Sequence, residues 1–389
     1  MKIGIVLNAV PGYSETFFYS KINGLAANGF EVYLFAKGKK NIDLKCRQHS
    51  PLPVHNSVLL RIFFVGLALP LAFLRSPRTM ARFCYLERNN GIQWTDLVRK
   101  IYLNAHIFPH PLDWLHFGFA TVAIDRELVA KAMPCKMAVS LRGYDINVYP
   151  KEHRNCYLKL WQQVDKVHSI SNYLLKEAFK LGLPQTVESK IISPAIDTKN
   201  IRQRDDFEFH KPLRLLTIAR LHPIKGLEVA IKAVKILATH GVDCNYVIVG
   251  EGDQLKELTQ LAQRLGIANR VNLLGRKPHT ETVAMLSTAD LYLQPSINEG
   301  FCNALLEAQG HACLCIASRA GAMEENIVEG QTGFLVLPAD ESQLANAITN
   351  AMGLTKNERK EICLTAAKRV KEKFDIAGYN NAWKEFYEQ

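Results

Sequence analysis

One pattern recurs along the chain of 389 residues: a short apolar run is followed by a turn and then by an amphipathic helical segment. The first copy runs from Ile3–Leu7 through a loop with Pro and Gly to a helical pattern at 17–28, and a strand-like run at 30–36 follows. The pattern restarts at Leu213–Ala219. Strands that alternate with helices predict parallel, doubly wound sheets, so we expect an α/β protein with two such domains.

The predicted domains are residues 1–196 and 212–374. Between them, residues 197–211 are polar and rich in both charges, as expected of a linker. The last segment, 376–389, has aromatic residues at intervals of three to four positions, which is typical of a helix with one packing face.

Positive charge is concentrated in the first half of the chain. Residues 1–195 hold 25 Lys and Arg against 13 Asp and Glu, whereas residues 196–389 hold 23 against 24. Such asymmetry favours an anionic partner, which is a nucleic acid, a membrane surface or an acidic substrate. No nucleic-acid-binding motif accompanies the basic residues, so we expect no nucleic-acid partner. The nine cysteines are odd in number and scattered, which favours a reducing compartment such as the cytoplasm.

The most apolar segment is Val58–Leu74, which Arg61 and Pro70 interrupt. About 20 uninterrupted apolar residues would be needed to cross a bilayer, so we do not expect a transmembrane helix. Basic residues follow it closely at Arg75, Arg78, Arg82 and Arg88. Two interpretations stay open: peripheral contact with an anionic membrane, or a buried core helix beside a solvated basic surface.

Two carboxylates, Glu299 and Glu307, stand eight positions apart in the segment 296–308. Glu299 is expected in a loop after a strand, and Glu307 about two turns into the next helix. A strand, a loop of small residues and a helix N-terminus form a phosphate-binding geometry, and a carboxylate on either side can accept hydrogen bonds from hydroxyls. A nucleotide-sugar has this layout. The alternative is that both glutamates are ordinary surface charges.

The same segment resembles the E-x7-E motif of the family 4 retaining glycosyltransferases. The resemblance implies that Glu299 holds the hydroxyls of the donor sugar and Glu307 those of the ribose. It also implies that the backbone at Phe301, Cys302 and Asn303 approaches the phosphates.

The loop at residues 11–17 resembles the P-x-x-S-E-T-F opening of family 4 enzymes that build bacterial exopolysaccharides. In that family the loop lies at the cleft, which implies that the Gly12 backbone approaches the donor phosphate and that Ser14 and Glu15 line the cleft. A plain turn with Ser14 as a helix N-cap is the alternative.

Further resemblances follow in the family's order. Arg220 and Lys225 match R-L-x-x-x-K-G, where two cations flank a strand-to-helix loop that suits a diphosphate. Gly250 lies in a turn that resembles hVGxG, and Arg276 lies where the family binds the base. By itself, the Arg220–Lys225 pair would also fit a surface loop.

His116 resembles the histidine of the family's D-x-x-H strand, which lies near the sugar and the acceptor; a structural histidine is the alternative. Further along, Arg142 replaces the histidine that commonly precedes Tyr144 and Asp145 in the family. Arginine can clamp a phosphate or carboxylate but cannot serve as a base near neutral pH. We assign Arg142, Tyr144 and Asp145 to the acceptor side of the cleft.

Together these motifs imply a GT-B fold: two facing Rossmann-like domains, with a C-terminal helix at 376–389 that packs back on the first. The implied reaction is the transfer, with retention, of a sugar from a UDP- or GDP-sugar to a hydroxyl of a glycan or polyprenyl-linked acceptor. We expect no metal, since no Asp-x-Asp cluster is present, and no cofactor. The expected location is the cytoplasm or the inner face of the membrane. A nucleotide-sugar epimerase and a non-catalytic nucleotide-sugar-binding protein remain as alternatives.

Overall fold

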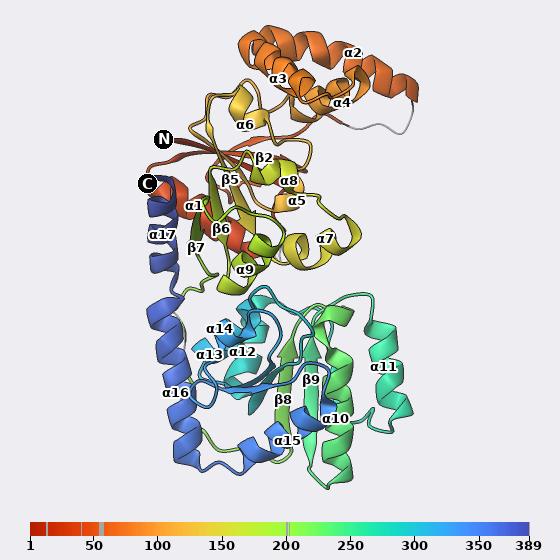
Figure 1. The fold of residues 1–389 in the computed structure, drawn as a ribbon. Coiled ribbons are helices and arrows are strands. Elements are labelled where there is room, and N and C mark those ends of the chain that lie inside the picture. Colours follow the sequence, from red (N-terminus) through yellow and green to blue (C-terminus); the bar gives the residue numbers. More distant parts are fainter. Residues whose placement is uncertain (13–14, 40, 54–57, 200, 202, 389) are drawn as a thin grey trace. The chain divides into compact units, whose positions relative to one another are not determined.

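The computed structural model describes residues 1–12, 15–39, 41–53, 58–199, 201 and 203–388. The chain divides into two compact units. Unit 1 comprises Met1–Ile192 with Asn380–Gln389, and unit 2 comprises Ser193–Tyr379. Each unit contains one parallel sheet with helices around it (Figure 1). The predicted class, α/β with two doubly wound domains, is confirmed.

The sheet of unit 1 has the order β3-β2-β1-β4-β5-β6-β7, and every pairing is parallel. Its strands are β1 (Lys2–Ala9), β2 (Glu31–Lys37), β3 (Arg47–His49), β4 (Trp114–Phe117), β5 (Lys136–Leu141), β6 (Lys166–Ser169) and β7 (Glu188–Ile191). Its helices are α1 (Thr16–Ala27), α2 (Val58–Arg75), α3 (Pro77–Asn89), α4 (Trp94–Asn104), α5 (Ala120–Ala123), α6 (Val129–Ala132), the π-helix η2 (Tyr144–Val148), α7 (Tyr149–Glu152), α8 (Leu158–Trp161), α9 (Asn172–Lys180) and the end of α17 (Ile376–Glu388). The strand order reverses between β1 and β4, which makes this pair the switch point of the sheet.

The sheet of unit 2 has the order β10-β9-β8-β11-β12-β13, and it is also parallel throughout. Its strands are β8 (Leu213–Ile218), β9 (Cys244–Val249), β10 (Val271–Leu273), β11 (Leu291–Gln294), β12 (Leu314–Ser318) and β13 (Phe334–Val336). Its helices are the 3-10 turn η3 (Pro223–Lys225), α10 (Leu227–Thr239), α11 (Leu255–Arg264), α12 (His279–Thr288), α13 (Asn303–Gly310), α14 (Met323–Asn326), α15 (Glu341–Met352) and α16 (Lys356–Lys373). Here the switch point lies between β8 and β11.

Both faces of the unit 2 sheet are buried, because helices pack on each of them. Successive side chains of a strand point to opposite faces and therefore enter different core clusters. In β11, Leu291 and Leu293 lie in one core cluster with residues of α10 and α15. Tyr292, between them, lies in the other cluster with residues of α12 and α13. In β12, Ile316 and Cys315 divide between the two clusters in the same way. This double burial fixes the register of the strands, and with it the positions of the loops at their carboxyl ends.

The end of α17 packs within unit 1, as the C-terminal helix was predicted to do. The aromatic rings of Trp383, Phe386 and Tyr387 are buried there. The Tyr387 carbonyl accepts a hydrogen bond from the Trp114 indole at 3.2 Å, and the Trp383 ring lies 5.5 Å from that of His116. A helix from the end of the chain therefore covers β4 near the start of the chain.

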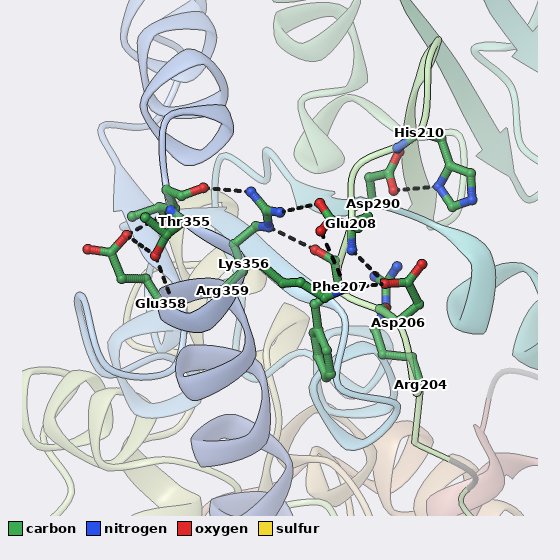
Figure 2. Close-up of polar contacts among 11 residues, drawn as sticks. Arg204, Asp206, Phe207, Glu208, His210, Asp290, Thr355, Lys356, Glu358 and Arg359 are labelled. Atoms are coloured by element: carbon green, nitrogen blue, oxygen red, sulfur yellow. Dashed lines mark hydrogen bonds and ion pairs between the residues drawn. The ribbon is translucent and has the colours of Figure 1, made fainter.

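Residues 203–211, which the sequence marks as a polar linker, are bound to unit 2 (Figure 2). Arg359 of α16 donates from Nε to the carbonyl of Phe207 at 2.9 Å. The Nδ1 atom of His210 lies 2.8 Å from a carboxylate oxygen of Asp290, whose side chain is buried. This part of the predicted linker is thus held by specific hydrogen bonds instead of running free.

Helices α2, α3 and α4 lie together in unit 1 (Figure 1), and α3 also contacts α6. Across the helices whose residues are described, none is long and apolar enough to cross a membrane. The C-terminal end of α2 is not core: Leu71, Phe73 and Leu74 are exposed there.

Candidate active site

The loops after β8 and β11 meet at the switch point of unit 2. Lys225, at the end of η3, places Nζ 2.5 Å from Oε1 of Glu299, and both side chains are largely buried. Gly226 follows with a φ of +59°, and a Cβ there would lie 2.1 Å from the carbonyl oxygen of Pro295. Only glycine allows the two loops to approach so closely, and the approach brings the lysine to the carboxylate.

A chain of hydrogen bonds orients Glu299. The Tyr292 hydroxyl donates to Gln294 Oε1 at 2.8 Å, which fixes the orientation of the Gln294 amide. Gln294 Nε2 then donates to Ser296 Oγ at 2.9 Å. The Ser296 hydroxyl in turn donates to Glu299 Oε1 at 2.8 Å. Glu299 Oε2 accepts no hydrogen bond from any described residue. The carboxylate is held through one oxygen, which leaves the other for a ligand hydroxyl.

Opposing effects act on Lys225. Burial lowers its pKa, whereas the Glu299 carboxylate raises it and the nearby Arg220 lowers it again; the net pKa is raised above the usual lysine value. Lys225 is therefore a cation at neutral pH. Arg220 lies exposed in the loop directly after β8. The two predicted cations thus lie at the carboxyl edge of the sheet.

Helix α13 begins beside this pair, and Cys302 occupies its N-cap without a side-chain cap bond. The Cys302 N–H donates to Asn326 Oδ1 at 3.2 Å, and Asn326 Nδ2 donates back to the Cys302 carbonyl. The Cys302 amide therefore already has an acceptor within the protein, and the approach of this stretch of backbone to the phosphates stays a prediction. Phe301 is buried, and Asn303 opens the first turn of α13. Burial raises the pKa of the Cys302 thiol to about 12.

Glu307 lies in the second turn of α13, as predicted. Its Oε1 is 3.5 Å from Nε2 of His279, the first residue of α12. Burial raises the pKa of Glu307, and the neighbouring His279 opposes that shift. The carboxylate is partly exposed and can accept hydrogen bonds beside the helix N-terminus.

The remaining donor-side residues lie at the ends of β9 and β10. Gly250 has a φ of +146°, and a Cβ there would lie 1.9 Å from the carbonyl oxygen of Ala219. The Gly250 amide donates to the carbonyl of Gly275 at 2.9 Å. Arg276 follows, 3.6 Å from a carboxylate oxygen of Glu251, and both of these side chains are well exposed.

At the switch point of unit 1, the loop after β1 closes on itself. The Gly12 amide donates to a carboxylate oxygen of Glu15 at 3.2 Å, and the Glu15 amide donates to the Gly12 carbonyl at 3.0 Å. Glu15 occupies the N-cap position of α1. Ser14 itself, which we assigned to the cleft, lies outside the described residues.

Two of the predicted acceptor-side residues are turned into the protein. Asp145 is fully buried and accepts hydrogen bonds from the backbone amides of Ala120, Arg142 and Gly143. Its assignment to the cleft is corrected: the carboxylate serves the sharp turn after β5. Arg142 is also buried, with its guanidinium carbon 3.9 Å from the ring centroid of Phe17.

Tyr144, which opens η2, is exposed and remains available to a ligand. A π-helix is rare and is frequent at functional sites, so its position directly after β5 supports keeping Tyr144 in the predicted site.

We predicted that His116 lies near the sugar and the acceptor. The structure corrects this assignment, because the His116 side chain is fully buried. Its Nε2 lies 2.8 Å from Ser140 Oγ, the Tyr387 hydroxyl lies 2.6 Å from its Nδ1, and Lys21 Nζ lies 3.2 Å from the ring. Burial, followed by the charge of Lys21, lowers the pKa of His116 well below its usual value. Ser140 also lies 2.8 Å from His168 Nδ1, so the cluster is a closed internal network.

Sequence reasoning missed the residues that position the site. Gln294 and Ser296 orient Glu299, and Asn326 holds the start of α13. The available signal was a glutamine at the end of an otherwise apolar strand, since a buried amide needs partners. Asn326 gave no comparable signal. Within the described ranges, no group of three His, Cys, Asp or Glu side chains is arranged to hold a metal ion.

Comparison with known proteins gives a consistent result. Residues 199–373 match the family of glycosyl transferases group 1. The chain is 27% identical over 398 residues to the amylovoran biosynthesis glycosyltransferase AmsK of Erwinia amylovora, with 96% of each chain covered. It is 26% identical over 409 residues to the putative colanic acid biosynthesis glycosyltransferase WcaL of Escherichia coli, again covering 96% of each.

Among solved structures, the Anabaena protein HepE in complex with UDP has a similar fold, with a TM-score of 0.72 at 17% identity over 99% of this chain and 98% of HepE. With unit 2 matched to the group 1 family and nearly the whole chain aligned to AmsK and WcaL, the protein is a glycosyltransferase of the GT-B fold, similar to those of bacterial exopolysaccharide biosynthesis.

Proposed function

We propose that the protein transfers a sugar, with retention at the anomeric carbon, from a UDP- or GDP-sugar to a hydroxyl of a glycan or lipid-linked acceptor in the synthesis of a cell-surface polysaccharide. The names of AmsK and WcaL support the polysaccharide, and the UDP bound to HepE supports a nucleoside diphosphate leaving group. The nine cysteines are all free thiols, which supports a reducing, cytoplasmic setting.

The observation that carries this proposal is the Lys225–Glu299 pair at the switch point of unit 2. Ligands of open α/β sheets bind at the carboxyl edge, at the switch point. The pair combines a cation for a diphosphate with a carboxylate whose second oxygen has no donor among the described residues. The cation suits the anionic diphosphate of a nucleotide-sugar, and the carboxylate can accept hydrogen bonds from the hydroxyls of its sugar.

Each residue then has a defined task. The C1–O bond to the diphosphate breaks, the acceptor oxygen forms a new bond to C1 on the same face, and the acceptor proton leaves with the diphosphate or to water. Lys225 and Arg220 stabilise the negative charge that develops on the leaving group. Glu299 holds the sugar hydroxyls and Glu307 the ribose.

The acceptor side is proposed at the carboxyl edge of unit 1. There, Glu15 and Tyr144 remain exposed or partly exposed, whereas His116 and Asp145 are buried. A general base in unit 1 is therefore not part of the proposal, which fits attack on the same face as the leaving group.

The test is turnover of UDP- and GDP-sugars, followed by proton NMR with and without an oligosaccharide or lipid-linked acceptor. The expected result is one nucleoside diphosphate released with a product in the donor's anomeric configuration. A product of inverted configuration would contradict retention. Interconversion of the free donor without acceptor would instead establish the epimerase alternative.

A further inference from the structure

We propose that unit 1 carries a binding surface for an anionic lipid bilayer on the outer side of α3. We call it the arginine face. It consists of the end of α2, the exposed side of α3 and the first residue of α4: Leu71, Phe73, Leu74, Arg75, Arg78, Arg82, Tyr85, Arg88 and Trp94. This proposal goes beyond the glycosyl transfer proposed above, since it concerns the surface that the protein binds and not the reaction that it catalyses.

The exposed residues of α3 form one stripe. Arg78, Arg82 and Tyr85 are all exposed and are three or four positions apart, so they lie on the same side of the helix. Met80 and Phe83 are buried on the other side. The helix therefore has an apolar side that packs in the protein and a basic side that faces solvent.

The one acidic side chain of α3 does not contribute to the arginine face. The only acidic residue of α3, Glu87, is buried and pairs with the buried Lys100 of α4 at 2.9 Å. Arg75, Arg78 and Arg82 form no ion pair within the part of the chain that the structure describes. The stripe is thus uniformly positive toward solvent, which complements an anionic surface.

Exposed apolar and aromatic side chains lie beside the arginines. At the end of α2, Leu74 is 76% exposed and Phe73 is 51% exposed. At the other end of α3, the guanidinium carbon of Arg88 lies 4.7 Å from the ring centroid of Trp94, which is 65% exposed, as is Tyr85. Aromatic rings and basic residues around exposed aliphatic side chains are typical of a surface that lies in a bilayer interface.

These apolar residues favour a bilayer over a nucleic acid. Phosphates of either partner would satisfy the arginines, but only the acyl boundary of a bilayer would also bury Phe73 and Leu74. The exposed end of α2 also argues against the alternative that this apolar segment is an ordinary core helix.

The test is co-sedimentation with vesicles of phosphatidylcholine alone and of equal parts phosphatidylcholine and phosphatidylglycerol. The charge variant is Arg75→Glu/Arg78→Glu/Arg82→Glu. Its matched control is Lys235→Glu/Lys256→Glu/Arg264→Glu on α10 and α11 of unit 2, which changes net charge equally. A second variant, Phe73→Ser/Leu74→Ser, keeps every charge.

The wild type is expected to sediment with the anionic vesicles only, and less as salt is added. The charge variant is expected to bind at least tenfold more weakly, the apolar variant about threefold more weakly, and the control as the wild type does. All of the changed side chains are exposed, so melting temperatures and the response to UDP or GDP should stay unchanged. Failure of the donor site would alter the nucleotide response and not the sedimentation.

Three results would overturn the proposal. The wild type could fail to bind anionic vesicles, or the unit 2 control could lose as much binding as the charge variant, which would reduce the effect to net charge. Finally, polyuridylate RNA could bind as tightly as the vesicles while the Phe73/Leu74 change has no effect, which would make the partner a nucleic acid.

Discussion

Units 1 and 2 both have a parallel sheet whose strand order reverses once, yet the side chains at the two carboxyl edges behave differently. In unit 2, Lys225 and Glu299 meet at the switch point, and one carboxylate oxygen is left without a donor among the described residues. In unit 1, the side chains of Arg142 and Asp145 turn inward and bind backbone groups of the segments after β4 and β5. The same topology therefore carries an ion pair at the carboxyl edge of one unit, and inward-turned charged side chains at that of the other.

The strongest test of this contrast is Lys225→Ala. The change removes the cation and leaves the buried Glu299 carboxylate unpaired, and we expect donor turnover to fall by roughly 10² to 10³. The measurement is release of UDP or GDP from the nucleotide-sugar at saturating acceptor. Lys235→Ala, on an exposed position of α10, is the control and should keep full activity. Equal rates for wild type and Lys225→Ala would contradict the assignment.

The next largest effect is expected in unit 1, on stability. Asp145→Ala leaves three backbone amides without their acceptor, and each buried, unsatisfied group costs on the order of 1 kcal/mol or more. We expect unit 1 to lose about 3 kcal/mol of unfolding free energy, measured by calorimetry of the full chain. An unchanged transition would restore Asp145 as a candidate ligand contact.

The buried histidines make unit 1 sensitive to acid. Burial, then the charge of a neighbour, lowers the pKa of His116 and of His106, the latter to about 3. Below a pH of about 6.5, these histidines bind protons in the unfolded chain but stay neutral in the folded unit. The free energy of unfolding therefore falls as the pH decreases.

The expected slope is about 1.4 kcal/mol per pH unit for each such histidine, followed as the melting temperature of unit 1 between pH 7.5 and 5. His116→Gln should reduce this slope, and His240→Asn, on an exposed residue of unit 2, should not. A pH-independent melting temperature would show that the histidines do not stay neutral.

The smallest stability effect is expected for Arg276→Ala. Its pair with Glu251 is exposed at both ends, and such pairs contribute well under 1 kcal/mol. If Arg276 contacts the base, the donor KM should rise about threefold while kcat stays the same. A fall in kcat with an unchanged KM would instead assign it to the reaction step.

The fold was largely readable from the sequence, because short apolar runs and amphipathic helices are local patterns. The helical pattern at 17–28, for example, differs by one residue at each end from α1 (Thr16–Ala27). The positions of Lys225 and Glu299 in loops after strands were readable from the apolar runs that precede them, and parallel pairing brings the ends of β8 and β11 together. The burial of His116 was not readable from the sequence, since the helix that covers it, α17, lies more than 250 residues away. The Cys302 amide was also not predictable, because its partner Asn326 comes from another loop.

The most direct measurement is the shift in melting temperature caused by UDP and GDP in the wild type and in Lys225→Ala, with uridine and guanosine as controls. A ligand that binds the folded state stabilises it as RT ln(1 + [L]/Kd). We predict that one diphosphate raises the wild-type melting temperature, that the shift is smaller in Lys225→Ala, and that its nucleoside alone has little effect. Absence of any shift with either diphosphate, or equal shifts in both proteins, would contradict a donor site built on Lys225 and Glu299.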